Sequence, residues 1–232
     1  MVGEKMKTSV IVANHGRDTS VLRNSLPKDV EYIEINKGLE RSVQRNMAIK
    51  QAKGDILIWL DSDQSLSPGV VKECEELIKM GYVAVYIPEV IVVKSFFGRI
   101  RAFERTFYTG TAVDVPKAVL MPFCPLFNEE LHGPEDADWG NKIKGLRAVS
   151  KNVLYHHDDI GFIDYCVKKS YYTKSMKRYA ELNPNDKCLN LKYRVWTVFT
   201  EKGKWKNLLR HPILTCGIIF LLIVRGIIYA KR

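Results

Sequence analysis

The chain has 232 residues, of which 46% are hydrophobic and 27% are charged, a composition that excludes an intrinsically disordered or low-complexity protein. The length allows one generous domain, or one domain with an attachment, and excludes a multidomain machine. The net charge of +10 arises in the last quarter, because residues 168–232 carry 15 Lys and Arg against 3 Asp and Glu. The five scattered cysteines include no C-x-x-C pair and favour a reducing compartment.

Short apolar runs alternate with helical patterns in the first part of the chain. In chain order, the patterns predict a strand at 8–13, a strand at 30–35, a helix at 41–53, a strand at 56–60, a helix at 68–80 and strand-like residues at 82–93 interrupted at Pro88. This alternation predicts an α/β fold in which helices cover a mostly parallel sheet. Ligands of such sheets bind beyond the carboxyl ends of the strands, so we expect the chemistry in the loops that follow them.

The loops after the first two strands are expected to line a nucleotide pocket. Ala13 ends the first strand, and the polar cluster 14–18 follows it, with Asn14, His15 and Arg17 as candidate contacts. After the second strand, Glu34 and Asn36 are the polar candidates for contact with a nucleobase.

The third strand ends in Asp61, Ser62 and Asp63. Two carboxylates at positions i and i+2 can share a hard divalent cation or a water molecule bound to it. A lone D-x-D is more often an acidic turn before the next helix, so the surrounding sequence has to decide.

The surrounding stretch 38–63 resembles the nucleotide-sugar half of the inverting glycosyltransferases of family 2. The residues that match in order and spacing are Gly38, Ser42, Arg45, Asn46, Ala52, Gly54, Asp55, Asp61 and Asp63. The resemblance continues through 122–148 and covers about residues 8–160. It implies a GT-A-like, Rossmann-type sandwich and the transfer of a sugar from a nucleotide sugar.

The departing nucleoside diphosphate develops negative charge during such a transfer. A divalent metal ion, Mn²⁺ or Mg²⁺, held by Asp61 and Asp63 would offset this charge, helped by Arg41 or Arg45 one helical turn apart. The two arginines could equally belong to a solvated helix face.

A second acidic motif, Glu135-Asp136-Ala137-Asp138, follows a Gly-Pro turn and opens a short helix. Acidic residues at a helix start complement the helix dipole, which is the structural explanation. The resemblance implies instead that Asp136 is the general base that deprotonates the acceptor hydroxyl, with Glu135 and Asp138 orienting neighbours or the acceptor. Trp139 either stacks on a sugar ring or packs in the core.

The segment 154–159 ends an apolar run in two histidines and two acids. In similar transferases a histidine at this place helps to hold the metal, and His156 matches the place better than His157. Neutral imidazole is a common metal ligand, although a lone surface histidine is commoner.

Residues 164–182 form a basic amphipathic helix with an aromatic stripe. A position at a membrane interface explains both features, and packing on the main domain is an equally serious explanation. Ser175, Arg178 and Tyr179 resemble the Q/R-x-x-R-W motif of cellulose-synthase-like relatives, which implies an acceptor or diphosphate role for Arg178.

Residues 212–230 are almost entirely apolar, with Arg225 as the only charge, and approach the roughly 20 residues of a membrane-spanning helix. We expect a single span or a deeply inserted monotopic helix, with Arg225 reaching the interface. Lys202, Lys204 and Lys206 precede the helix, and the N-terminus lacks a signal-peptide pattern. These features predict a catalytic domain on the cytoplasmic side of a membrane.

The sequence therefore predicts a glycosyltransferase domain at 1–160, a basic interface region at 161–207 and a C-terminal membrane helix at 208–232. The expected partners are a nucleotide-sugar donor, with GDP-mannose slightly favoured over UDP-hexoses, and a glycan acceptor on a polyprenyl carrier. A dolichyl-phosphate-sugar synthase is the alternative acceptor chemistry. A nucleotidyltransferase and a non-enzymatic protein that binds nucleic acid or membrane remain as alternatives of other classes, although acidic loops repel nucleic-acid phosphates.

Overall fold

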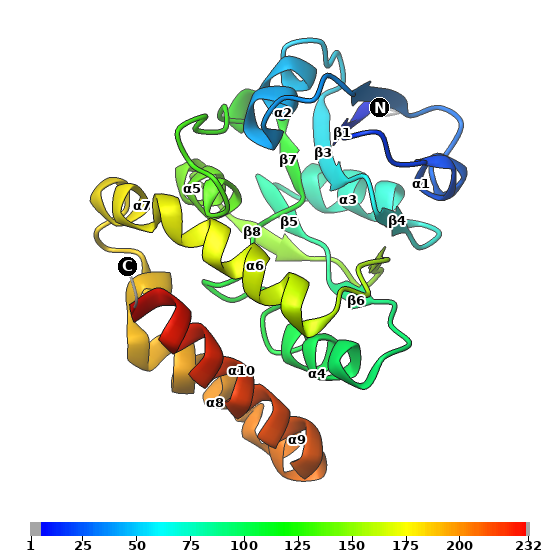
Figure 1. The fold of residues 1–232 in the computed structure, drawn as a ribbon. Coiled ribbons are helices and arrows are strands. Elements are labelled where there is room, and N and C mark those ends of the chain that lie inside the picture. The colour runs from blue at the N-terminus through cyan, green and yellow to red at the C-terminus, as the bar shows by residue number, and fades with distance from the viewer. Residues whose placement is uncertain (1–5, 231–232) are drawn as a thin grey trace.

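The computed structural model describes residues 6–230 and contains two β-sheets surrounded by helices (Figure 1). The strands are β1 (Thr8–Ala13), β2 (Glu31–Ile35), β3 (Ile56–Asp61), β4 (Gln64–Leu66), β5 (Ala84–Tyr86), β6 (Glu89–Ile91), β7 (Ala118–Leu120), β8 (Arg147–Val149) and β9 (Leu154–His156). The α-helices are α1 (Ser20–Ser25), α2 (Arg41–Ile49), α3 (Val70–Lys79), α4 (Phe96–Arg105), α5 (Glu135–Lys142), α6 (Phe162–Tyr172), α7 (Met176–Leu182), α8 (Val198–Thr200), α9 (Trp205–Arg210) and α10 (Pro212–Ala230). Shorter 3-10 or π-helical turns are η1 (Met121–Phe123), η2 (Thr173–Ser175), η3 (Lys187–Leu189), η4 (Tyr193–Thr197) and η5 (Glu201–Gly203).

The larger sheet has the strand order β2-β1-β3-β7-β5-β8. The pairs β1–β2, β1–β3 and β5–β8 are parallel, whereas β7 runs antiparallel to both of its neighbours. The prediction of a mostly parallel α/β sheet is therefore confirmed.

The register of this sheet brings the polar loops together at one edge. Ala13 at the end of β1 lies opposite Ile35 of β2 and Asp61 of β3. Because β7 runs in the opposite direction, its beginning reaches the same edge, and the carbonyl of Lys117 accepts a hydrogen bond from Trp59 N–H at 3.0 Å. Loops from four strands thus meet at this edge.

The smaller sheet, in the order β4-β9-β6, lies beside this edge. Its register places His156 opposite Gln64 of β4 and Ile91 of β6. Residues 82–93 therefore form two short strands in different sheets, β5 and β6, because Pro88 between them donates no ladder hydrogen bond.

The strands of the large sheet alternate their side chains between two apolar layers. Ile58 and Leu60 pack with α1 and α3 on one face, and Leu57 and Trp59 pack with α2 and α5 on the other. The result is a three-layer sandwich, as the family resemblance implies. Helix α2 ends at Ile49, earlier than the predicted 53, and 50–53 turn back toward β3.

A third apolar core lies below the sandwich and joins α4 to the C-terminal helices. It contains Ile100 of α4, Tyr165 of α6, Phe199 of α8 and Leu221 of α10. The lower part of Figure 1 shows these helices side by side. One hydrophobic core therefore crosses the expected boundary at residue 160.

The helix α10 is the one segment of the described residues that is long and apolar enough to cross a membrane. It packs lengthwise along the protein, with Ile218, Leu221 and Arg225 buried on one side. Arg225 does not extend to an interface as expected, because its guanidinium forms a buried ion pair with Glu104 of α4.

Candidate active site

Asp61 and Asp63 flank a turn at Ser62 between β3 and β4, at the edge where the strand ends meet. The Asp61 carboxylate lies 2.6 Å from Arg45 Nη2 and 3.9 Å from Lys117 Nζ. Burial alone would raise the pKa of Asp61, but the positive charges of Lys117 and Arg45 lower it well below its usual range. Asp61 is therefore an ionised carboxylate in a largely enclosed, positively charged setting.

Asp63 faces His156, which reaches it because β9 pairs with β4. Asp63 Oδ1 lies 3.3 Å from His156 Nε2, and the other carboxylate oxygen pairs with Arg17. His156 Nδ1 lies 2.7 Å from Glu89. Burial opposes the charged imidazole, but hydrogen bonds to Asp63 and Glu89 raise the pKa of His156 to about 9.

Two of the three predicted metal ligands are close enough to act together. A histidine whose Nδ1–H is donated to a carboxylate presents Nε2 as a ligand, and Glu89 supplies that carboxylate. Asp63 and His156 therefore fit a divalent cation once the imidazole gives up the Nε2 proton that it shares with Asp63, whereas Asp61 is turned toward Arg45 and Lys117. Within residues 6–230 no three His, Cys, Asp or Glu side chains form a ready-made metal cluster. The remaining positions would fall to phosphate oxygens, as is usual for Mg²⁺.

Two arginines from α2 turn inward instead of forming a solvated face. Arg45 is 2% exposed, and its guanidinium lies over the rings of Trp59 at 4.4 Å and Phe127 at 5.0 Å. Glu135 Oε1 lies 2.9 Å from Arg41 and 3.4 Å from Arg45. Glu135 is thus an orienting residue that fixes both arginines beside Asp61.

Asp136 lines the same cavity as Asp61 and Lys117, which has a volume of about 250 Å³. One of its carboxylate oxygens accepts a hydrogen bond from Ala137 N–H at 2.8 Å. Burial, reinforced by the nearby negative charge of Glu135, raises the pKa of Asp136 above its usual range. A carboxylate with a raised pKa binds a proton more readily, which suits a general base.

Trp139 packs in the core and cannot stack on a sugar. It is fully buried, stacks on Phe127 at 5.1 Å and donates its indole N–H to Pro125 O at 2.8 Å. Of the two environments that the sequence allowed for Trp139, the structure has core packing, because α5 turns this side chain under the sheet and away from the cavity.

Asp138 and Arg178 do not line the cavity either. Asp138 is buried and held by Lys142 at 2.6 Å and by Asn183 at 2.9 Å, so it braces α5. Arg178 is half-exposed and pairs with Glu130 at 3.0 Å. An acceptor role for either side chain remains a prediction without a contact to support it.

The loop after β1 is held in place by a partly buried polar network. Asn14 donates to Arg17 O at 2.8 Å and to Glu34 at 2.7 Å, and His15 lies 3.2 Å from Gln44. Glu34 also accepts hydrogen bonds from Thr19, Tyr32 and Arg23. Although burial opposes it, these donors lower the pKa of Glu34 to about 2. Glu34 is thus engaged in holding the loop, and His15 and Arg17 are exposed there.

The sequence reasoning missed Lys117 and Glu89, which complete the site. Lys117 lies over the Trp59 ring with its ammonium 3.3 Å from the ring centroid. Glu89 orients His156 and pairs with Arg105 at 3.2 Å. A signal exists in the sequence, since each residue is a single charge inside an apolar run.

Comparison with known proteins identifies the family. Residues 6–133 match the family model described as glycosyl transferase family 2. The chain belongs to this family. It is therefore a nucleotide-sugar-dependent glycosyltransferase, and the alternatives of a nucleotidyltransferase and a non-enzymatic binding protein are set aside.

Solved structures share the fold of this glycosyltransferase at low sequence identity. S. aureus TarS 1–349 in complex with UDP-GlcNAc matches with a TM-score of 0.51 and 16% identity over 97% of this chain and 91% of that chain. The same fragment in complex with UDP matches with a TM-score of 0.50 and 16% identity. A longer TarS structure matches with a TM-score of 0.50 and 18% identity, over 74% of this chain and 40% of its own length. No curated protein matches the chain.

Proposed function

We propose that this glycosyltransferase moves a sugar, with inversion, from a nucleotide sugar to a lipid-linked glycan at a membrane surface on the cytoplasmic side. The observation that carries the proposal is the shared cavity of Asp61 and Asp136, which is lined by one paired, ionised carboxylate and one with a raised pKa. Two carboxylates in such different environments suit different tasks in one reaction.

The donor would lie along the loops after β1 and β3. Asn14, His15 and Arg17 would contact the nucleotide, and Arg41 and Arg45 would stabilise negative charge near the sugar phosphate. A bound Mn²⁺ or Mg²⁺ would neutralise charge on the departing diphosphate, and Asp63 with His156 would hold it. The TarS complexes contain UDP-GlcNAc and UDP, which supports a UDP-hexose donor beside GDP-mannose.

Asp136 would act on the acceptor side of the sugar. Its carboxylate would accept the proton of the attacking hydroxyl, while its backbone contact to Ala137 and the burial of α5 hold it in place. Lys117, whose ammonium lies 3.9 Å from Asp61 in the same cavity, would balance the negative charge that Asp136 and Asp61 place there together.

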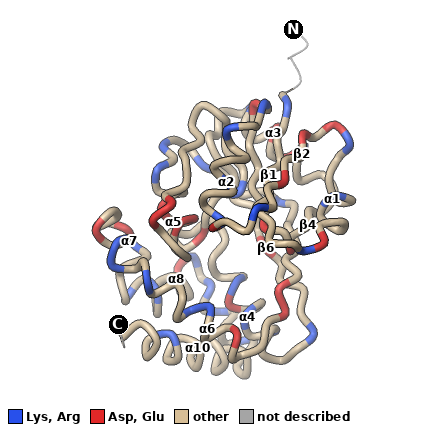
Figure 2. The backbone as a smooth tube through the Cα atoms, turned by 45° about the horizontal axis from the view of Figure 1, so that its top comes forward, with Lys and Arg blue, Asp and Glu red and all other residues tan. Residues whose placement is uncertain are grey.

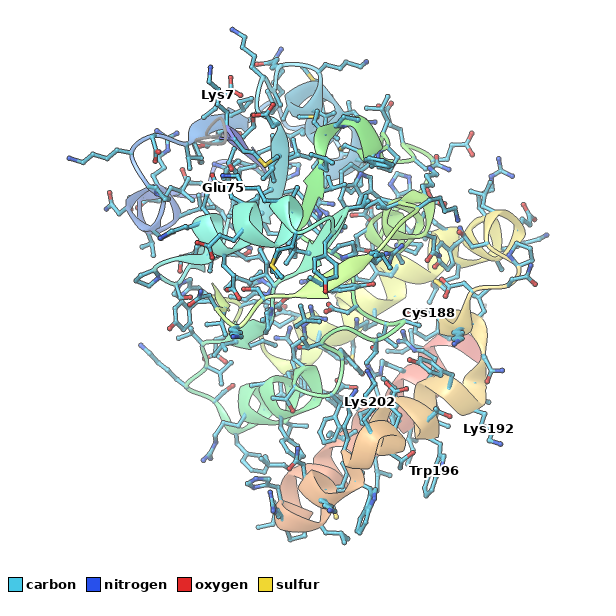
Figure 3. All side chains as sticks on the ribbon, turned by 180° about the vertical axis from the view of Figure 1, so that it is seen from behind. Lys7, Glu75, Cys188, Lys192, Trp196 and Lys202 are labelled. Carbon is cyan, nitrogen blue, oxygen red and sulfur yellow. The ribbon has the colours of Figure 1, made fainter. Side chains whose placement is uncertain are left out.

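The membrane part of the proposal rests on the C-terminal helices. The side of α10 that faces away from the protein is apolar along its length and includes Ile213, Ile219, Phe220, Ile223 and Ile227, each at least half exposed. Figure 2 shows α10 almost free of charged residues, whereas α4 and α6 beside it carry them. On the neighbouring helices, Trp196 and Lys192 extend outward (Figure 3), as expected for residues at a lipid head-group level.

The function is tested by transfer of labelled sugar from a panel of nucleotide sugars into extracted lipids, with purified full-length protein in detergent. Mn²⁺ or Mg²⁺ is added, and a chelator serves as control. We expect chelator-sensitive label in the lipid phase, absent from Asp136→Asn and retained in Asp164→Asn, whose carboxylate is exposed on α6. Transfer from no donor, together with no donor binding, would contradict the proposal.

A polyprenyl-phosphate-sugar synthase is the second candidate. The phosphate of that acceptor is already ionised, so the reaction depends less on a base. Near-full activity of Asp136→Asn with a polyprenyl phosphate would support this candidate over a glycan acceptor.

A further inference from the structure

The cavity that contains Asp61 and Asp136 continues to a second end, away from the sheet. This far end is lined by side chains from α4, α6 and α10: Arg101, Glu104, Tyr165, Lys168, Lys169 and Arg225. The sandwich supplies the first end and the C-terminal helices supply the second. The far end is therefore a separate chemical environment within the same cavity.

Positive charge exceeds negative charge at the far end. Glu104 is paired with Arg225, and Asp158 is shared by Arg101 at 2.8 Å and Lys168 at 3.5 Å. Within residues 6–230 no carboxylate lies within ion-pair distance of the remaining cation, Lys169.

The ammonium of Lys169 is held between two tyrosine rings. It lies 5.5 Å from the ring centroid of Tyr165 and 5.3 Å from that of Tyr172. Burial, and after it the positive charge of Arg225, lowers the pKa of Lys169 to about 7. A lysine that lacks an acidic partner beside other cations is stabilised when an anion binds.

A second, independent feature points to the same place. Tyr165 is 3% exposed and its hydroxyl is buried without a hydrogen-bond partner in the described part of the chain. Buried hydroxyl groups nearly always have a partner, and those without one call for an explanation. Because Tyr165 lines the cavity beside Lys169, an acceptor atom bound there would satisfy this hydroxyl.

We propose that Lys169, Arg225 and Tyr165 form a second anion subsite, which binds the phosphate of a prenyl-type lipid carrier while the nucleotide occupies the first end. The subsite rests on the proposed lipid-linked acceptor and names the residues that recognise it. Phosphate oxygens accept charge-assisted hydrogen bonds from lysine and arginine and a further hydrogen bond from a hydroxyl.

The position of Arg225 selects a lipid phosphate over a soluble one. Arg225 belongs to α10, whose opposite side is the exposed apolar surface. At this apolar surface, the rings of Phe162 of α6 and Phe220 of α10 have centroids 5.6 Å apart, and both side chains are partly exposed. A phosphate bound by Arg225 is therefore one helix width from a surface on which an isoprenoid chain can lie.

The test is calorimetric titration of the full-length protein with geranyl phosphate, in the presence of saturating UDP or GDP to fill the nucleotide site. Geraniol and inorganic phosphate are the matched probes for the chain and for the anion. We expect geranyl phosphate to bind at least tenfold more tightly than either. Lys169→Gln should weaken it at least tenfold and Tyr165→Phe about threefold to tenfold, because each removes one hydrogen bond to the phosphate.

Lys177→Gln is the control variant, because Lys177 is exposed on α7 and lies outside the cavity. Its geranyl phosphate affinity should equal that of the unaltered chain, and all three variants should keep their nucleotide affinity within twofold. Equal binding in Lys169→Gln would overturn the subsite. If geranyl phosphate bound only in the absence of UDP or GDP, its phosphate would belong to the donor site and the subsite would be overturned. If inorganic phosphate bound as tightly as geranyl phosphate, a lipid phosphate as the ligand would be overturned. The titration does not depend on catalysis, so failure of sugar transfer would be distinguished from failure of the subsite.

Discussion

The two ends of the cavity balance their charges in different ways. At the sheet edge three carboxylates have a positive partner: Asp61 has Arg45, Asp63 has His156 and Glu135 has Arg41. At the helical end, Lys169 has no carboxylate partner among residues 6–230 and the Tyr165 hydroxyl is unsatisfied there. The sheet edge is therefore organised before substrate arrives, whereas the helical end reaches its best arrangement only with an anion bound. Preorganised charge favours the reaction step, and an unsatisfied subsite favours binding.

The largest effect is expected for Asp136→Asn, which removes the base and leaves the shape of the sheet edge unchanged. Transfer to a glycan hydroxyl should fall about 10²–10⁴-fold, the usual contribution of a general base. Donor affinity should be retained, since within residues 6–230 the Asp136 side chain bonds to Ala137 N–H and not to the loops that would contact the nucleotide. Initial rates and donor titrations on the same preparation would measure both quantities.

A second test measures how much the buried ion pair of Glu104 and Arg225, at the helical end of the cavity, contributes to the stability of the protein. Removal of one partner, as in Glu104→Gln, should lower the free energy of unfolding by about 3 kcal/mol, because it leaves a buried charge without compensation. Replacement of both residues by Met should restore most of the loss. Chemical unfolding in detergent would measure the free energy of unfolding of each variant. Equal stability of Glu104→Gln and the unaltered chain would mean that α10 leaves α4 in solution.

The parts of the site that the sequence predicted are those with short-range patterns. The strands at 8–13 and 56–60, Asp61 and Asp63, and the acidic start of α5 are each encoded within a few residues. Lys117 and Glu89 were not predicted as site residues, because a single charge in an apolar run has no local partner that marks its role.

The sequence pattern could not predict which distant residues form pairs or in which direction a side chain points. Arg225 finds Glu104 at a distance of 121 residues in the sequence, so the lone charge in an apolar helix looked like an interface residue. Trp139 had two plausible environments, and only the packing of α5 on Phe127 selects the core.

The pH dependence of transfer would sharpen the assignment of the base at the sheet edge. Asp136 is active as a base only when ionised, and burial together with Glu135 raises its pKa. The pKa that governs kcat/KM should therefore lie above the ordinary aspartate value of about 3.9. At pH values below that pKa, kcat/KM should fall tenfold per pH unit. Circular dichroism at each pH would separate this loss from unfolding. A profile that stays flat to pH 4 would exclude Asp136 as the base.

The smallest effect is expected for Arg178→Ala, on the surface of α7 outside the cavity. Arg178 is half-exposed, and its ion pairs with Glu130 at 3.0 Å and Glu181 at 3.4 Å are solvated, so their loss should cost no more than about 1 kcal/mol of stability. The acceptor KM should not change, because Arg178 does not line the cavity. Steady-state kinetics with varied acceptor, beside Lys177→Ala as a matched change on the same helix, would measure this. A rise in acceptor KM confined to Arg178→Ala would mean that α7 moves toward the cavity when the acceptor binds, and it would restore the acceptor role that the motif resemblance implies.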